Sequence, residues 1–290
     1  MGRFRPVEWV SPTTVAEATQ ILKERRAKLI AGGTGLYELA KRGMLPDIDV
    51  LVDLGSLNME FLKIENGSLR IGAGSRFTWL LQQELLQRPD LVGLREAISN
   101  VKPVQVRNVA TVGGALSISL PFLDFPPAAL GFDAMVVLVG PEKKERVVPV
   151  GSFWLDYLLP DLRKGELMTE IRIPLSTQES GSAFLKQGRT PGDFALVNVC
   201  TRLLFGSDGI CKEAAISLGG VANVPMRQTR AEGLLKGQKL FKEIILKASE
   251  AVNETNPTPS IHGSPWYKRE ISKVLVRDSL LLSSQRAGFP

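Results

Sequence analysis

The stretch LIAGGTGLYEL, residues Leu29–Leu39, constrains the fold more than any other part of the sequence. An apolar run breaks into small residues and resumes with helical spacing, which predicts a strand, a tight turn and a helix. The turn contains Gly32, Gly33 and Gly35, and glycine loses more conformational entropy on folding than any other residue. We therefore expect a ligand, most simply a phosphate group, against this bare backbone. A tight strand-to-helix turn without a ligand is the alternative.

This first glycine loop matches neither common phosphate motif. The tripeptide GTG at Gly33–Gly35 begins like the dinucleotide fingerprint, but Glu38 stands where the third glycine belongs. No Lys-Ser or Lys-Thr pair follows, as a P-loop requires. A second loop, TVGG at Thr111–Gly114, repeats the combination of small residues and a hydroxyl. Backbone N–H groups and a threonine hydroxyl bind phosphate oxygens well, so the two loops together predict a clamp for a pyrophosphate.

Hydrophobic periodicity predicts a mixed α and β chain with two domains. Asn66-Gly67 is a strong hairpin signal between two strand-like runs, and the polar stretch Ser176–Ser182 is the candidate domain boundary. We expect domains at 1–175, with lobes at about 1–54 and 55–175, and at 182–290. Helices are predicted at 15–26, 35–42, 78–87, 91–100, 240–252 and 265–283, the last beginning at Ser264-Pro265, and strands at 28–30, 50–54, 61–65, 69–73, 134–139, 145–150, 166–173, 194–205 and 211–218.

Composition limits the chemistry that the chain can carry. Its 290 residues, 44% of them hydrophobic, can bury a sizeable core. Two cysteines, Cys200 and Cys211, and one histidine, His262, are too few for an iron–sulfur or histidine-rich metal site, so any metal chemistry belongs to another chain. The net charge of +6 is spread along the chain, which favours a basic surface that docks on acidic partners over nucleic-acid binding.

Targeting signals are not evident in the sequence. No apolar run is long enough to cross a bilayer, and Met1–Val10 contains no continuous apolar signal segment. We therefore expect a cytoplasmic protein.

Several segments together resemble one protein family, the flavin subunit of molybdenum hydroxylases. This family includes the medium subunit of carbon monoxide dehydrogenase and the FAD domain of xanthine dehydrogenase. The resemblance lies in LIAGGTGL, in RNVATVGG followed by PFLD, in LRKGELMTEIRIP and FLKQGRTPGDFALV, and, for the C-terminal domain, in ISLGGVANVPMRQTRAEGLLKG and HGSPWYKREISKVLVRDSL. It implies an α+β architecture: a two-lobed FAD-binding fold of the vanillyl-alcohol-oxidase (PCMH) type, followed by a C-terminal α+β domain with an antiparallel sheet and helices.

In this family the two glycine loops hold the FAD pyrophosphate. Carried over by position, the resemblance implies FAD contacts at Leu29, Ile30, Ala31, Gly32, Gly33, Thr34, Gly35, Leu36, Val101, Thr111, Val112, Gly113, Gly114, Ala115, Asp124, Leu162 and Lys186, with no catalytic residue and no metal ligand. Asp124 would accept hydrogen bonds from the ribose, and Lys186 would lie near the isoalloxazine. The alternatives are a helix N-cap for Asp124, core packing for Leu162 and a solvated strand residue for Lys186.

Two positions depart from the family pattern. The family often has Asp or Ser at Gly35 and Asn at Ala115, so Ala115 lacks a hydrogen-bonding side chain beside the flavin. Because backbone contacts survive such a change, we expect FAD binding to persist.

The resemblance implies an electron-transfer subunit of a molybdenum-containing hydroxylase or dehydrogenase, within a heterotrimer. Electrons would pass from [2Fe-2S] clusters on a partner chain through FAD to NAD or another acceptor, and a molybdopterin-binding large subunit would oxidise the substrate. One alternative is a self-contained flavin oxidoreductase, although one histidine and three tyrosines offer few groups for substrate chemistry. The other is a scaffold or assembly protein that has lost FAD, for which Ala115 is the one supporting feature.

Overall fold

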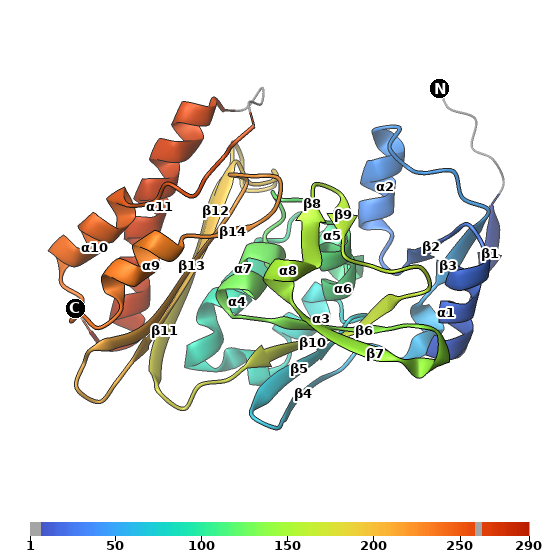
Figure 1. Cartoon of the computed structure of the whole chain (residues 1–290), viewed down its shortest axis with the longest axis horizontal. Coiled ribbons are helices and arrows are strands. Elements are labelled where there is room, and N and C mark those ends of the chain that lie inside the picture. The colour runs from blue at the N-terminus through green and yellow to red at the C-terminus, as the bar shows by residue number, and fades with distance from the viewer. Residues whose placement is uncertain (1–6, 259–262, 290) are drawn as a thin grey trace.

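The computed structural model describes residues 7–258 and 263–289. Figure 1 shows three parts side by side: an N-terminal lobe in blue, a central lobe in cyan to yellow-green, and a C-terminal part in yellow, orange and red. Each part contains its own β-sheet and its own cluster of buried apolar side chains. The predicted α+β architecture is confirmed.

The N-terminal lobe is a small parallel sheet with two helices. Its elements are β1 (Glu8–Val10), α1 (Val15–Glu24), β2 (Ala27–Ile30), α2 (Thr34–Lys41) and β3 (Val50–Asp53), and the strand order is β1-β3-β2. Helix α1 begins at Thr14, whose hydroxyl accepts a hydrogen bond from the Glu17 N–H at 3.2 Å. The sequence predicted these elements except β1, which pairs along β3 at the sheet edge.

The central lobe is built on a five-stranded antiparallel sheet with the order β4-β5-β10-β6-β7. The strands are β4 (Leu62–Glu65), β5 (Ser68–Gly72), β6 (Met135–Val139), β7 (Glu145–Pro149) and β10 (Leu167–Pro174). Between β4 and β5, Asn66 and Gly67 have φ values of 51° and 70°, which is the left-handed conformation that a type I′ turn requires. The predicted hairpin is confirmed.

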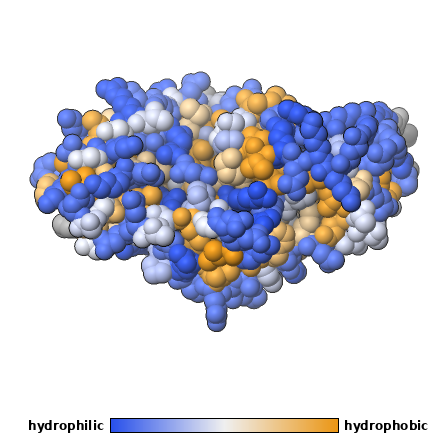
Figure 2. Space-filling view, turned by 60° about the horizontal axis from the view of Figure 1, so that its bottom comes forward, coloured by the Kyte–Doolittle hydropathy of each residue, from blue (hydrophilic) through white to orange (hydrophobic). Residues whose placement is uncertain are grey.

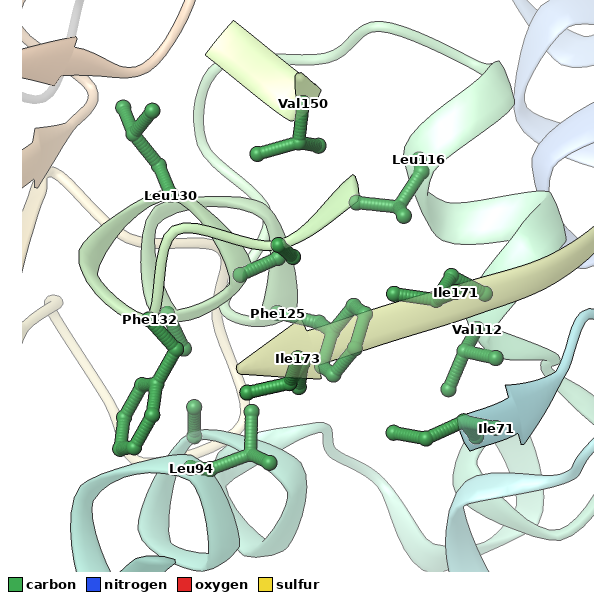
Figure 3. Close-up of a cluster of buried hydrophobic side chains, with 14 of the residues drawn as sticks. Ile71, Leu94, Val112, Leu116, Phe125, Leu130, Phe132, Val150, Ile171 and Ile173 are labelled. Atoms are coloured by element: carbon green, nitrogen blue, oxygen red, sulfur yellow. The ribbon is translucent and has the colours of Figure 1, made fainter. Parts of the chain in front are cut away.

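Short helices cover one face of this sheet and carry the second glycine loop. They are α3 (Phe77–Leu81), α4 (Val92–Asn100), α5 (Val104–Val109), α6 (Val112–Ser117), α7 (Phe125–Gly131) and α8 (Val150–Phe153), followed by a ribbon of β8 (Trp154–Asp156) and β9 (Leu159–Pro160). Figure 3 shows apolar side chains of α4, α6 and α7 meeting those of β5 and β10. The helix predicted at 78–87 is wrong in part, because extended backbone at Gln83 separates α3 from a 3₁₀ helix at Glu84–Gln87.

The C-terminal part is a four-stranded sheet with helices on both faces. Its elements are β11 (Glu179–Gln187), β12 (Val197–Phe205), β13 (Cys211–Gly219), β14 (Met226–Arg227), α9 (Thr229–Leu235), α10 (Lys242–Glu250) and α11 (Pro265–Arg286). Helices α4 and α7 pack on one face of this sheet, and α9 and α11 pack on the other (Figure 1). Every residue of β12 is therefore buried. The N-cap predicted at Ser264 is confirmed, since its hydroxyl accepts from Tyr267 N–H at 3.2 Å.

The polar stretch expected at the domain boundary is partly a strand. Strand β11 begins at Glu179, and Gly181 sits under α11, where a Cβ atom would overlap the carbonyl oxygen of Ser283. Small residues in this stretch thus serve close helix-to-strand packing as well as a connection.

Within the two described ranges, no helix has both the length and the apolar character needed to cross a bilayer. Figure 2 shows hydrophilic residues over most of one face, with separate apolar patches between them.

Candidate functional site

The first glycine loop leads from the carboxyl end of β2 into α2. Gly33 is the N-cap residue with a φ of 70°, a left-handed conformation that glycine adopts without strain, and it has no side chain to cap the helix. The first backbone donor to find an acceptor inside the helix is Tyr37 N–H, at 2.9 Å from Gly33 O. The N–H groups of Thr34–Leu36 lie ahead of it and have no acceptor within the helix, so they suit an anion.

Protein atoms lie against the backbone at the other two glycines, Gly32 and Gly35. A Cβ atom on Gly32 would overlap the carbonyl oxygen of Val109 at the end of α5. A Cβ atom on Gly35 would lie 2.6 Å from the Cδ1 atom of Ile118, just after α6. Packing against the backbone oxygen of Val109 therefore requires glycine at position 32, whereas a side chain at position 35 would have to displace only the end of the Ile118 side chain. Both contacts place α2 close to the segment that carries the second glycine loop, as Figure 1 shows for α2 and α5.

The second loop forms the N-terminus of α6, and most of its donors are already used. Val112 N–H donates to Ser75 O at 3.1 Å, and Gly113 N–H donates to Ala73 O at 2.9 Å. The expectation of bare N–H groups is thus wrong for Val112 and Gly113, which are also buried. These donors are used because the loop hydrogen-bonds to the connection after β5.

Gly114 is the residue at which the second loop is open to solvent. Gly114 is exposed, its N–H donates to the Thr111 hydroxyl at 3.2 Å, and a Cβ atom there would meet only that hydroxyl oxygen, at 3.0 Å. The Thr111 hydroxyl still has a proton to donate. Ala115 is half-buried and packs against the central core. A ligand can therefore approach this loop at Gly114.

Asp124 and Lys186 form a buried ion pair between the central and C-terminal parts. Lys186 Nζ lies 2.8 Å from Asp124 Oδ2, and each side chain is 8% exposed. Burial raises the pKa of Asp124, while Lys186 and then Asn198 act in the opposite direction. Asp124 occupies the N-cap position of α7 but makes no capping hydrogen bond. The solvated alternative for Lys186 is wrong, because its ammonium is buried against this carboxylate.

Phe122 contacts two other segments of the chain, and these contacts were not expected from the sequence. The rings of Phe122 and Phe194 have centroids 4.9 Å apart. The guanidinium of Arg42, at the end of α2, lies 6.0 Å from the centroid of Phe122. Helix α2, the segment before α7 and the loop after β11 therefore meet at Phe122.

The other predicted site residues lie at the margins of this arrangement. Leu29 and Ile30 are the last residues of β2 and pair with β3, whereas Ala31 is exposed in the turn. Val101, the C-cap of α4, and Leu162, just after β9, are half-buried and pack against the central core. Among the described contacts, no hydrogen bond joins Val101 or Leu162 to the glycine loops.

Asn198 is the functional candidate that sequence reasoning missed. It is fully buried on β12 and donates a hydrogen bond to Asp124 Oδ1 at 3.2 Å. An amide inside the apolar run ALVNVC is the signal that could have revealed it, because buried polar side chains are retained with hydrogen-bond partners.

The chain's cysteines do not form a ligand set. Cys200 and Cys211 are free and buried on β12 and β13, and burial raises the pKa of Cys211 to about 11. Burial raises the pKa of Cys200 as well. In the part of the chain that the structure describes, no three His, Cys, Asp or Glu side chains are grouped as metal ligands, and His262 lies outside those residues.

Comparison with known proteins covers nearly the whole chain. The profile of the FAD binding domain in molybdopterin dehydrogenase matches residues 3–176, and that of the CO dehydrogenase flavoprotein C-terminal domain matches residues 182–282. The carbon monoxide dehydrogenase medium chain of Hydrogenophaga pseudoflava is 30% identical over 94% of this chain and 95% of its own length. The glyceraldehyde dehydrogenase medium chain of Sulfolobus acidocaldarius is 28% identical over 92% and 95%.

A solved structure supports the same relationship. Carbon monoxide dehydrogenase from Hydrogenophaga pseudoflava, in a form lacking the Mo-pyranopterin moiety, aligns with a TM-score of 0.91 and 29% identity over 97% of this chain and 98% of that one. The family match and the fold thus define an FAD-dependent oxidoreductase subunit. The chain belongs to the family of FAD-binding domains in molybdopterin dehydrogenases, which confirms the resemblance described above.

Proposed function

We propose that this chain is the electron-transferring flavin subunit of a heterotrimeric molybdenum hydroxylase. It takes electrons from [2Fe-2S] clusters on one partner chain and passes them through FAD to NAD or another acceptor. A molybdopterin-binding large subunit oxidises the substrate. The named relatives are medium chains of carbon monoxide and glyceraldehyde dehydrogenases, which supports a role as one subunit of such an assembly. Two free thiols fit a cytoplasmic location.

The proposal rests on one contrast: the chain has backbone donors that suit a pyrophosphate, but its described residues contain no cluster of metal ligands. The chain provides two glycine loops, the first packed against Val109 and Ile118 on either side of the second, with donors at the start of α2 that suit a pyrophosphate. In its described residues it provides no group of side chains suited to hold a metal. The donor set fits FAD, and the electrons that reach FAD would have to come from groups on other chains.

We assign the FAD-holding roles to residues of both glycine loops and their surroundings. The N–H groups of Thr34–Leu36 and the positive end of the α2 dipole would hold the pyrophosphate, assisted by the Thr111 hydroxyl. Asp124 and Lys186 expose only the edge of each side chain, so each would touch the flavin through a few atoms. The positions from Leu29 to Ala31, together with Val101 and Leu162, would contribute apolar contact. Bound FAD supplies the step between one-electron and two-electron transfer, and the protein orients it and limits its exposure to water.

We also propose a domain division that follows the two family matches. The FAD-binding domain would comprise residues 1–175, with lobes at about 1–54 and 55–175, and the C-terminal domain residues 182–290. The separate sheets of the two lobes and of the C-terminal part support this division.

Rapid mixing tests the electron-relay role. The FAD-loaded chain alone is expected to bleach near the oxidised-flavin absorption band with dithionite but not with a substrate of the complex. Substrate is expected to bleach the flavin only when the iron–sulfur and molybdenum subunits are added. Substrate-driven bleaching by the isolated chain would instead identify a self-contained oxidoreductase. A complete complex that never bleaches would identify a scaffold.

A further inference from the structure

The segment 121–124 between α6 and α7 is hydrogen-bonded to the C-terminal sheet at every residue. The four bonds run from Gly220 N to Pro121 O at 2.8 Å, from Ala195 N to Phe122 O at 3.3 Å, from Asn198 Nδ2 to Leu123 O at 3.0 Å and from Lys186 Nζ to Asp124 Oδ2 at 2.8 Å. The donors lie on β11 or near the ends of β12 and β13. The position of Asp124 is therefore set by the C-terminal sheet as well as by its own lobe.

Asn198 is the one donor of this group that holds both the main chain and the carboxylate. Its Nδ2 atom donates to Leu123 O and, at 3.2 Å, to Asp124 Oδ1. Lys186 holds the other carboxylate oxygen, Oδ2. With one oxygen on each partner, the carboxylate of Asp124 cannot rotate about its Cβ–Cγ bond without losing a hydrogen bond.

The orientation of the Asn198 amide is fixed by its surroundings. Both partners of Nδ2 are oxygen acceptors, so the reversed amide would place Oδ1 against a carbonyl and a carboxylate. In the described structure Oδ1 is buried and accepts no hydrogen bond. Opposite it lies Gly219, where a Cβ atom would collide with Oδ1. The Oδ1 atom of Asn198 is thus buried without a hydrogen-bond partner. Because an unpaired buried acceptor costs stability, Asn198 is not explained by a purely stabilising role.

We propose that Asn198 is a positioning residue of the FAD site, and that the C-terminal sheet sets FAD affinity through its hydrogen bond to Asp124. This inference rests on the proposed contact between Asp124 and FAD. Asp124 exposes only a small edge, so a small rotation of its carboxylate removes that edge from the ligand. Without Asn198, the carboxylate would be held by Lys186 through one oxygen and would be free to rotate.

A double-mutant cycle separates positioning from general stability. FAD binding to the apoprotein is measured by quenching of flavin fluorescence, for Asn198→Leu, Asp124→Ala and the double variant. Thr201→Val is the matched control, because Thr201 is also buried on β12 but bonds to Ser279 and Ser283 of α11. Thermal unfolding of the full chain accompanies each titration and shows whether each variant folds.

We expect Asn198→Leu to raise the Kd for FAD about tenfold or more, because the freed carboxylate of Asp124 would lose its proposed hydrogen bond to FAD, and a hydrogen bond to a charged group contributes about that much. In the Asp124→Ala background the same substitution should raise it by less than about twofold, because its partner is gone. Thr201→Val should also change it by less than about twofold. If Asp124→Ala does not fold, Asp124→Asn replaces it, and the Asn198 effect must again be smaller than in the native background.

Three results would overturn the inference. Equal effects of Asn198→Leu in both backgrounds would show a structural role, and no effect in the native background would show no role. Normal FAD affinity in Asp124→Ala would overturn the inference while leaving FAD binding by the glycine loops intact. Failure of the native chain to bind FAD would instead overturn the proposed function.

Discussion

Gly114→Ala separates the stability of the chain from its affinity for FAD. At this exposed position of α6, the new methyl group meets only the Thr111 hydroxyl, at 3.0 Å, which must yield by a few tenths of an ångström. Replacing a helical glycine with alanine stabilises a helix by about 0.5 kcal/mol or more, because the unfolded chain loses freedom. The free energy of unfolding of the apoprotein is therefore expected to stay constant or rise slightly.

FAD affinity is expected to move in the opposite direction. If a phosphate or ribose of FAD packs against Gly114, the methyl group overfills a close contact, and such overpacking costs about 1–3 kcal/mol. This corresponds to an increase of about 5- to 150-fold in the Kd for FAD. A ligand contact predicts that the free energy of unfolding stays constant or rises while the affinity for FAD falls. A packing defect would instead lower the free energy of unfolding.

The neighbouring glycine provides the matched control. In Gly113→Ala the new methyl group would lie 2.7 Å from both the Cβ and the carbonyl oxygen of Ala73, inside the buried core. Gly113→Ala should lower the free energy of unfolding by about 1–3 kcal/mol, and the midpoint of thermal unfolding should fall with it. Fluorescence titration with FAD and thermal unfolding of the apoprotein are measured for both variants. An unchanged Kd in a folded Gly114→Ala protein would refute the reasoning, since FAD would not approach α6 at this residue.

Three further outcomes are expected. Lys186→Met leaves a buried carboxylate without its cation, so urea titration should show a loss of about 3 kcal/mol in the free energy of unfolding. Burial raises the pKa of Glu166, but the hydrogen bonds from Arg146 and from the Arg163 N–H, together with the charges of both arginines, outweigh burial and hold that pKa below its ordinary value. This stability is present at neutral pH and is lost as the pH falls below about 4, so Arg146→Met should lower the unfolding midpoint at pH 7 and flatten its decline in acid. Because burial raises the pKa of Cys211 to about 11, and that of Cys200 also rises, a thiol reagent at neutral pH should label neither until the chain unfolds.

Local sequence signals predicted the elements that depend on local chemistry. The Asn66-Gly67 turn and the helix cap at Ser264 were found because particular residues are needed at those positions. Strand β1 was missed because three residues at a sheet edge form no pattern of their own. Helix α5 was missed, and α7 was considered only as the alternative in which Asp124 is an N-cap, because both helices are short and owe their stability to packing rather than to propensity.

The candidate site was predictable as a set of segments but not as a geometry. The glycines of both loops were identified from the sequence, but the structural reason for glycine differs from one position to the next. Gly32 makes room for Val109, Gly33 supplies a left-handed backbone, and Gly114 leaves an open approach. These reasons depend on contacts between residues far apart in the sequence, which no spacing rule contains. The hydrogen bond from Asn198 to Asp124 is of the same kind.

The contact of Gly32 with the carbonyl of Val109 has a consequence for the kinetics of cofactor loading. The two lobes already touch at this point through protein atoms alone, so an incoming dinucleotide need not draw them together. Binding then avoids most of the entropy cost of ordering loops, which is the advantage of a preorganised site. Association should follow a single second-order phase, and affinity differences among variants should reside mainly in the rate of cofactor release.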